Sequence, residues 1–308
     1  MNLQQLRFVR ETVRNGFSLT RAAQALRTSQ PALSRGILEL EAELGVDIFV
    51  RHGKRITGLT EPGKAIRQRA ERALAEVGGI ERVASDYRAR DAGELRIATT
   101  HTQARYLLPT VIREFRRRYP AVRLSLLQGS PQQISSQVIS READFAVATE
   151  VPEDVPELVL IPSVEWRHVI LVPDGHPLLG QPVTLERLAQ YKIVTYVEAF
   201  AGRRRIDRAF EQAGIEPDVV LSAIDSDVIK TYVSLGLGVG IVAGMAYDPA
   251  RDRGLVAIPA GHLFGVNRVR LAVHRAAYLR GFAIAFIELL APDADRALIE
   301  SLRSAGTA

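Results

Sequence analysis

Residues 28–35 read Thr28-Ser29-Gln30-Pro31-Ala32-Leu33-Ser34-Arg35, and this pattern predicts a break in the chain followed at once by the start of a helix. Proline suits the first turn of a helix because its missing N–H would have no partner there. Gly45 is typical of the residue that ends a helix. Between these signals, apolar residues recur at helical spacing and predict a buried face made of Leu33, Ile37, Leu40 and Leu44.

Two shorter helices are predicted before this one. Apolar residues at helical spacing mark the first, which ends at Asn15-Gly16, and they are Leu3, Leu6, Val9 and Val13. Ser18 is a suitable N-cap for the second, whose inward residues are Ala22, Ala23 and Leu26. Residues 48–57 then read as two short strands around His52-Gly53. Together these elements predict a winged helix-turn-helix.

This motif indicates where DNA would be read. The second helix of such a pair enters the major groove through its N-terminal end, where Gln can bond adenine, Arg can bond guanine and Ala can contact a thymine methyl group. The hairpin tip would reach phosphates. The predicted DNA-binding residues are Ser29, Gln30, Ala32, Ser34 and Arg35 on the helix and Arg51, Lys54 and Arg55 on the hairpin. The alternative is a small helical interaction module in which Ser and Gln only cap helices.

The positive charge of the chain is concentrated at this end. The 308 residues include 40 Lys and Arg and 35 Asp and Glu, a net charge of +5. Residues 1–60 hold nine basic and five acidic residues, so they carry +4 and the remaining 248 residues carry +1. A positive end favours a polyanionic partner, although a merely basic surface would give the same count. Because the remainder is nearly neutral, we expect it to select anions with hydroxyl groups and helix ends.

Composition excludes several other classes of protein. With 47% hydrophobic and 24% charged residues, the chain is expected to be globular and soluble, and its length suggests two domains. The lack of cysteine excludes disulfides, thiolate zinc sites, iron–sulfur clusters and a cysteine nucleophile. We expect no membrane association, no export signal and a cytoplasmic location. The six His residues lack metal-ligand spacing and no nucleophile motif occurs, so we predict no catalytic residue, no metal and no cofactor.

A longer helix is predicted over residues 61–89. Its apolar residues are spaced alternately four and three apart, the heptad pattern of a coiled coil. They are Ile66, Ala70, Ala73, Val77, Ile80, Ala84 and Tyr87. This seam favours a dimer, since two-fold operators need two-fold proteins. The alternative is that the stripe packs on its own chain.

From Gly93 onward, strand and helix signals alternate. The strand-like segments are residues 95–98, 122–126, 145–148, 169–172, 193–196, 219–221 and 269–273. Their alternation with helical segments predicts a mainly parallel sheet in two units with a cleft between them. Ligands of parallel sheets bind beyond the carboxyl ends of strands, and three such ends carry hydroxyl and amide groups. These ends are residues 99–103, 128–131 and 148–149, and the alternative is that their Ser and Thr only cap helices.

Several strings resemble a known family. In the N-terminal part, the resemblance is to the DNA-binding domain of LysR-type transcriptional regulators, and it rests on residues 28–35, Leu38-Glu39, Glu43-Leu44-Gly45, Phe49, Arg51 and Leu59-Thr60. In the large domain it is to the CysB-like branch, whose members regulate sulfur assimilation or sulfonate use, and it rests on residues 98–106, 128–131, 143–145, 148–150 and 227–233. The resemblance extends over the whole chain.

The resemblance implies an architecture and a set of partners. An N-terminal all-α winged helix-turn-helix would occupy residues 1–60, a dimerisation helix 61–89 and an α/β, periplasmic-binding-protein-like effector domain 90–308. Subdomain I of the effector domain would comprise about 90–163 and 267–308, and subdomain II about 164–266. Such a regulator forms a homodimer or homotetramer, binds promoter DNA and a small-molecule effector, and acts on RNA polymerase.

The resemblance also implies the effector class, which is an acetylserine, a sulfur oxyanion or an organosulfur compound. An anion would be held by Thr100, Thr102, Gln103 and Thr149, with Ser130 at a neighbouring strand end. Three positions depart from the family. Ala201 replaces a threonine expected at the anion, Glu198 would repel a dianion if it pointed inward, and Gly36 replaces a larger residue in the recognition helix. We therefore expect a ligand other than sulfate and an altered base readout.

These observations predict a sequence-specific DNA-binding regulator of sulfur-source genes that responds to an effector in the interdomain cleft. One alternative is a LysR-type regulator of another pathway. The other is a solute-binding protein, or an enzyme, on the same effector fold, which the N-terminal 89 residues argue against.

Overall fold

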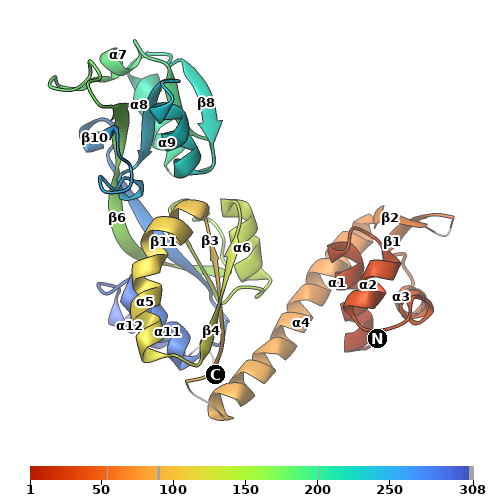
Figure 1. The fold of residues 1–308 in the computed structure, drawn as a ribbon. Coiled ribbons are helices and arrows are strands. Elements are labelled where there is room, and N and C mark those ends of the chain that lie inside the picture. Colours follow the sequence, from red (N-terminus) through yellow and green to blue (C-terminus); the bar gives the residue numbers. More distant parts are fainter. Residues whose placement is uncertain (54, 89–90, 201, 305–308) are drawn as a thin grey trace. The chain divides into compact units, whose positions relative to one another are not determined.

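The computed structural model describes residues 1–53, 55–88, 91–200 and 202–304, and it divides the chain into two compact units, Met1–Ala84 and Ser85–Ala308 (Figure 1). Each unit has its own hydrophobic core. In the part of the chain that the structure describes, no helix combines the length and the apolar character needed to span a membrane.

The N-terminal unit is a winged helix-turn-helix, as the sequence predicts. Its elements are α1 (Leu3–Arg14), α2 (Leu19–Ala25), α3 (Gln30–Leu44) and an antiparallel hairpin of β1 (Phe49–His52) and β2 (Arg55–Leu59). The Ser18 and Ser29 hydroxyls cap α2 and α3 by accepting a backbone amide each. Gly45 ends α3 in the left-handed region, with φ of 70°.

The third helix packs closely on the first at Gly36. This glycine is buried, and a Cβ atom there would lie 2.6 Å from the ring of Phe8. No larger side chain fits without moving that ring, so position 36 faces the core. The expectation that Gly36 alters base readout is therefore wrong, because the residue does not face the side of α3 that carries Gln30 and Arg35.

The first part of the long helix α4 (Glu61–Arg88) packs its apolar side chains against its own chain. The Thr60 hydroxyl accepts the Gly63 amide at 2.9 Å and caps the helix. Ile66 and Ala70 of the predicted seam pack on the core of the N-terminal unit together with Leu74, which is outside that seam, whereas the seam residue Ala73 is exposed. Farther along, Ile80 is 70% exposed. The stripe therefore divides into a part that packs on its own chain and a part that is open to solvent.

The larger unit is a mixed nine-stranded sheet in the order β4-β3-β5-β11-β6-β9-β7-β8, with β10 paired to β6. Two long strands, β6 (Leu158–Pro173) and β11 (Val266–His274), run antiparallel and link its two halves (Figure 1). Subdomain I has the parallel strands β3 (Gly93–Thr99), β4 (Val122–Gln128) and β5 (Phe145–Ala148). Subdomain II has β7 (Ile193–Tyr196), β8 (Val219–Ala223), β9 (Val239–Ala243) and β10 (Leu255–Pro259).

Helices cover these strands. Subdomain I contains the π-helical turn η1 (Gln103–Leu107), α5 (Leu108–Arg118), α6 (Pro131–Ile139), α11 (Gly281–Leu290) and α12 (Arg296–Ser304). Subdomain II contains α7 (Leu185–Leu188), α8 (Arg203–Gln212), α9 (Ser226–Ser234), the short turn η2 (Gly244–Ala246) and α10 (Gly261–Phe264). The rings of Phe115, Phe145 and Phe286 meet in the core between α5, α11 and the sheet.

Parallel pairing is confined to the strands within each subdomain. The linking strands β6 and β11 pair antiparallel with each other and with their neighbours β9 and β5. The predicted parallel pairing is therefore found inside each subdomain but not where the two subdomains join. The sequence prediction placed a strand only at the end of β6 and had none at β10. The expected subdomain limits near residues 163 and 266 fall inside β6 and at the first residue of β11.

Candidate functional site

The N-terminal half of α3 presents polar side chains to solvent. Gln30, Ala32 and Arg35 are exposed, and Ser34 is half-buried. The Ser29 hydroxyl accepts the Ala32 amide at 3.3 Å, so it caps the helix. These positions match the end of a recognition helix that enters a major groove, and their contact with DNA remains a prediction.

A buried carboxylate joins the hairpin to α3. Glu41 is 5% exposed, and its Oε1 accepts the amides of Ile48 and Phe49 at 2.9 and 3.0 Å. Its Oε2 accepts a hydrogen bond from Arg51 Nη2 at 2.8 Å. Arg51, predicted as a phosphate contact, therefore also fixes the hairpin, a role that sequence reasoning missed. Arg55 is exposed, and Lys54 lies outside the described residues.

A hollow of about 790 Å³ lies between the hairpin and the helices of this unit. It is lined by the turn before α2, by Gln30, and by His52, Arg55 and Thr57 of the hairpin. The hollow brings Gln30, a predicted base contact, and Arg55, a predicted phosphate contact, to one surface.

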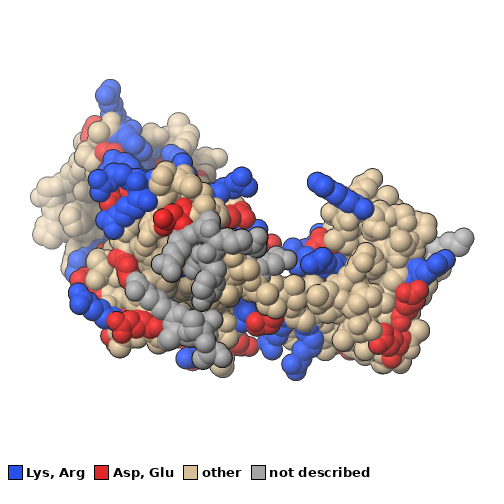
Figure 2. Space-filling model, turned by 90° about the horizontal axis from the view of Figure 1, so that it is seen from below, with Lys and Arg blue, Asp and Glu red and all other residues tan. Residues whose placement is uncertain are grey.

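On the face shown in Figure 2, basic and acidic side chains are interspersed over the larger unit, in keeping with its small net charge.

In the larger unit, three loops meet at the carboxyl ends of β4, β3 and β5, which are neighbours in the sheet. The loops after β3 and β5 carry four buried polar side chains, each at most 9% exposed: Thr100, Thr102, Gln103 and Thr149. Thr149 lines the cavity described below, whereas the other three do not. Among the described residues, none hydrogen bonds to the Thr100 or Thr102 hydroxyl. Free hydroxyls beside buried amides are suited to an anion or a polar ligand.

Thr149 is the centre of this cluster. Its Oγ1 accepts Gln103 Nε2 at 3.1 Å and Trp166 Nε1 at 3.0 Å. With both lone pairs occupied, the hydroxyl proton is left to donate elsewhere. Gln103 Oε1 is buried and has no partner within the described residues. The cluster therefore offers the hydroxyl protons of Thr100, Thr102 and Thr149 as donors and Gln103 Oε1 as an acceptor, none of them satisfied by a described residue.

Other predicted effector contacts are placed differently. The Ser130 hydroxyl accepts the Gln133 amide at 3.3 Å, and the Gln133 side chain bonds back to the Ser130 amide at 2.8 Å, which is a capping box at the start of α6. Glu198 is exposed and does not line the cavity described next. Ala201 lies outside the described residues. Ligand contacts by these three residues remain predictions.

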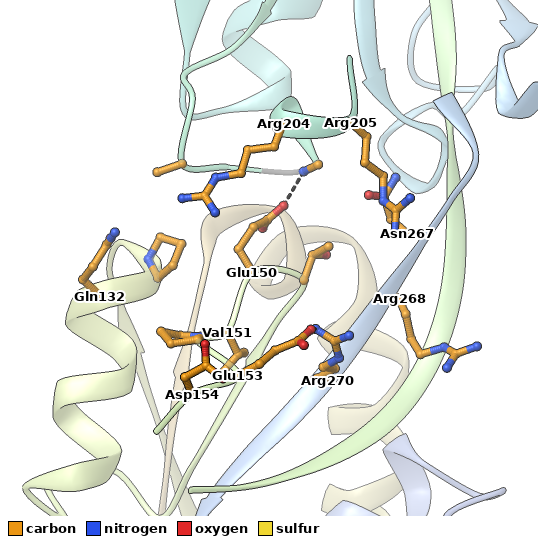
Figure 3. A pocket seen from close by; sticks show the side chains of 15 residues that line it. Gln132, Glu150, Val151, Glu153, Asp154, Arg204, Arg205, Asn267, Arg268 and Arg270 are labelled. Carbon is orange, nitrogen blue, oxygen red and sulfur yellow. Dashed lines mark hydrogen bonds and ion pairs between the residues drawn. The ribbon is translucent and has the colours of Figure 1, made fainter. Parts of the chain in front are cut away.

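A cavity of about 580 Å³ lies between the two subdomains, and Thr149 is one of the residues that line it. Figure 3 shows its walls, with Arg204 and Arg205 of α8 on one side and Glu150, Glu153 and Arg270 on the other. Arg270 pairs with Glu153 at 2.8 Å, whereas no described carboxylate pairs with Arg204 or Arg205. This cavity is therefore lined by guanidinium groups, which were not expected from the sequence, as well as by the Thr149 hydroxyl.

Glu150 connects the two walls. Its Oε1 accepts the Gly202 amide at the start of α8, as the dashed line in Figure 3 marks. Gly202 has φ of 72°, and a Cβ atom there would lie 2.4 Å from Asn267 Oδ1. Only glycine fits this backbone and this space. Three arginines at the start of α8, where the helix dipole disfavours cations, were the signal in the sequence that could have identified this wall.

Among the described residues, no group of three or more His, Asp and Glu side chains is placed to hold a metal ion. The cavity contains hydroxyls, amides, guanidinium groups and carboxylates, which can bind and orient a small polar molecule.

Two family models match the chain. The "LysR substrate binding domain" matches residues 88–295, and "Bacterial regulatory helix-turn-helix protein, lysR family" matches residues 3–64. The chain is 58% identical to the transcriptional regulator CysB of Burkholderia cenocepacia over 97% of its own length and 96% of that protein's. It is 53% identical to the regulator SsuR of the same organism, over 98% of both chains.

Solved structures agree with these matches. The cofactor-binding domain of the Cbl transcriptional regulator is 44% identical, with a TM-score of 0.65, over 69% of this chain and 92% of that one. Full-length CbnR complexed with its target DNA is 20% identical, with a TM-score of 0.68, over 94% of this chain and 99% of that one. The second likeness concerns the fold alone.

Proposed function

Because the chain belongs to the LysR family of bacterial transcriptional regulators, we propose that it binds promoter DNA through α3 and its hairpin and regulates sulfur-source genes, those of cysteine biosynthesis or sulfonate use. The exposed side chains of Gln30 and Arg35 support a reading role for the first half of α3. Arg55, beside the same hollow, is placed to contact a phosphate.

The observation that carries the effector part of the proposal is the buried cluster around Thr149. A cluster of neutral polar groups at two strand ends, with one buried acceptor unsatisfied at Gln103, costs stability unless a ligand with a donor group uses it. The guanidinium groups of Arg204 and Arg205 across the cavity attract an anion. We infer that the effector is a small anionic or amino-acid-derived molecule of the acetylserine, sulfur-oxyanion or organosulfur class.

Oligomer formation is the third part of the proposal. Ile80 on α4 is 70% exposed, and the apolar side chains of Val228, Tyr232 and Leu235 form an exposed stripe on α9. Such stripes are more often contact surfaces than solvated ones. A homodimer or homotetramer would place two copies of α3 on the two halves of an operator in the cytoplasm, beside RNA polymerase.

The test combines DNA binding with ligand binding. Wild-type protein should retard DNA from upstream of a sulfur-source gene in a gel shift, and sodium sulfate, thiosulfate or O-acetyl-L-serine should raise its melting temperature. Thr100→Val should abolish the effect of these ligands and leave DNA binding intact. If the wild type binds no promoter of this class, or if the variant responds as the wild type does, the assignment is refuted.

The same experiment separates the runner-up functions. A regulator of another pathway would bind a different promoter and respond to none of these ligands. A solute binder would respond to a ligand without retarding DNA. A solute-binding protein does not need a helix whose exposed polar face fits a DNA groove, so the exposed polar face of α3 favours the regulator.

A further inference from the structure

The π-helical turn η1 joins the effector cluster to the opposite subdomain. It begins at Gln103, which is 1% exposed and bonded to Thr149. Turns of this type are rare and are found frequently at functional sites. Tyr106, three residues later, belongs to the same turn. One short segment therefore carries both a predicted ligand contact and the residues described next.

The far end of this turn contacts the first turn of α9 in subdomain II. Tyr106 Oη donates to Asp227 Oδ1 at 2.7 Å, and Arg105 Nε lies 2.5 Å from Asp227 Oδ2. Just before η1, His101 Nε2 lies 3.1 Å from Asp225 Oδ2, at an angle that makes no hydrogen bond. These contacts cross from one subdomain to the other, so they depend on how far the subdomains are closed.

Asp227 is held firmly by its own subdomain. Lys230 Nζ lies 3.0 Å from Asp227 Oδ1 and also bonds Asp252 and the Ala246 carbonyl, both at 2.9 Å. Partial burial opposes the charge on Asp227, yet the hydrogen bonds from Tyr106 and Lys230 hold its pKa below the ordinary value. Burial and the neighbouring Asp227 raise the pKa of Tyr106, so the phenol remains a donor. Their bond is therefore a charge-assisted one.

We propose that Tyr106 and Asp227 are positioning residues that transmit effector binding at Gln103 to the closure of subdomain II. A ligand that carries an N–H or O–H donor, such as the ammonium of O-acetyl-L-serine, would give the unsatisfied Gln103 Oε1 a partner and so act on the first residue of a five-residue turn. Tyr106 lies within that same turn, so its bond to Asp227 differs between the two states. A ligand changes a conformational equilibrium only through such differential contacts. The proposal rests on the effector site proposed above.

The chain offers matched variants for a test. Tyr106→Phe removes only the hydroxyl, and Tyr119→Phe is its control, since Tyr119 packs on Phe115 within subdomain I. Asp227→Asn removes the charge, and Asp207→Asn is its control, since Asp207 pairs with Arg203 within α8. Calorimetry with sodium sulfate and with O-acetyl-L-serine would measure effector affinity. Promoter affinity would be measured with and without each ligand.

Tyr106→Phe and Asp227→Asn should each reduce the effector-induced change in promoter affinity by about fivefold or more, the lower end of ordinary allosteric coupling. Promoter affinity without effector should stay within about twofold. The double variant should lose no more of the response than Asp227→Asn alone, because that change already removes the bond to Tyr106. Control variants should behave as the wild type. A wild-type response in Tyr106→Phe, or additive losses in the double variant, would overturn the proposal.

If neither probe binds the wild type, the proposed effector class fails, and the link is then decided without ligand. Hydrogen exchange of the effector-free proteins should show that Tyr106→Phe speeds exchange both in residues 103–107 and in residues 226–234. Faster exchange confined to the mutated side, or none, would show that the two segments are not coupled.

Discussion

Replacing Thr149 with valine is expected to destabilise the effector-binding unit and to remove its response to effector. Valine has nearly the shape of threonine but cannot accept a hydrogen bond. The change leaves two buried donors, Gln103 Nε2 and Trp166 Nε1, without the acceptor that lies 3.1 and 3.0 Å away. Both donors belong to residues that are at most 5% exposed.

The size of the effect follows from these two donors. Leaving a buried donor unpaired costs about 1–3 kcal/mol, which gives about 2–6 kcal/mol for the pair. Thr149 is 9% exposed beside a cavity, so water can relieve part of the loss, and we expect the lower half of that range. For a unit of this size, about 2–4 °C of melting temperature corresponds to each kcal/mol, so the melting point should fall by about 5–15 °C.

Calorimetric unfolding of the effector-binding unit would measure this, with Thr149→Ser as the matched control. Serine keeps the acceptor oxygen and loses one methyl group, which costs about 1 kcal/mol. A Thr149→Val protein that unfolds at the wild-type temperature would refute the reasoning. So would a Thr149→Ser protein that is as unstable as the valine variant, because the loss would then come from packing and not from the hydroxyl.

Three other perturbations separate the roles of the two units. Glu41→Ala should destabilise the N-terminal unit by about 2–4 kcal/mol in thermal unfolding, because two buried amides lose their acceptor, whereas the exposed Glu39→Ala should have little effect. Gln30→Ala and Arg35→Ala should each weaken specific promoter binding by about 1–3 kcal/mol in a footprint titration and leave the sedimentation coefficient unchanged; unaltered footprints would reject this reading of α3. Because the folded-state pKa of Asp227 is lowered, its stabilising effect should be full above pH 3.8 and be lost as the pH falls through the lower folded value. The gap in melting temperature between wild type and Asp227→Asn should therefore close in acid, and a gap that does not depend on pH would contradict this.

The winged helix-turn-helix could be predicted because its signals are local. Pro31, Gly45 and Ser18 each act on the backbone within a few residues, and the apolar spacing between them fixes which face of each helix is buried. The same locality explains the error at Gly36. Its partner, Phe8, lies 28 positions away on another helix, and no local pattern distinguishes a glycine that faces a ring from one that faces DNA.

The effector cleft could be predicted only on the side that strand ends build. Thr100 and Thr149 stand at such ends, where the topology of a parallel sheet brings loops together. The opposite wall, with Arg204 and Arg205, is separated from Thr149 by more than 50 positions along the chain, and the linking strand β6 lies between them. Trp166 lies inside the long strand β6, whose first half the sequence prediction missed, so its donation to Thr149 was hidden as well.

In the proposed effector site, neutral groups would hold a charged ligand because hydrogen bonds within the protein already orient them. Gln103 and Trp166 both donate to the Thr149 oxygen, which fixes the hydroxyl rotamer and polarises its remaining proton. A ligand then meets a donor that is already ordered, so little conformational entropy is lost on binding. Arg204 and Arg205 are exposed, and their attraction for an anion is screened by salt. Selectivity therefore resides in the buried cluster, and the arginines contribute chiefly to how readily an anion reaches it.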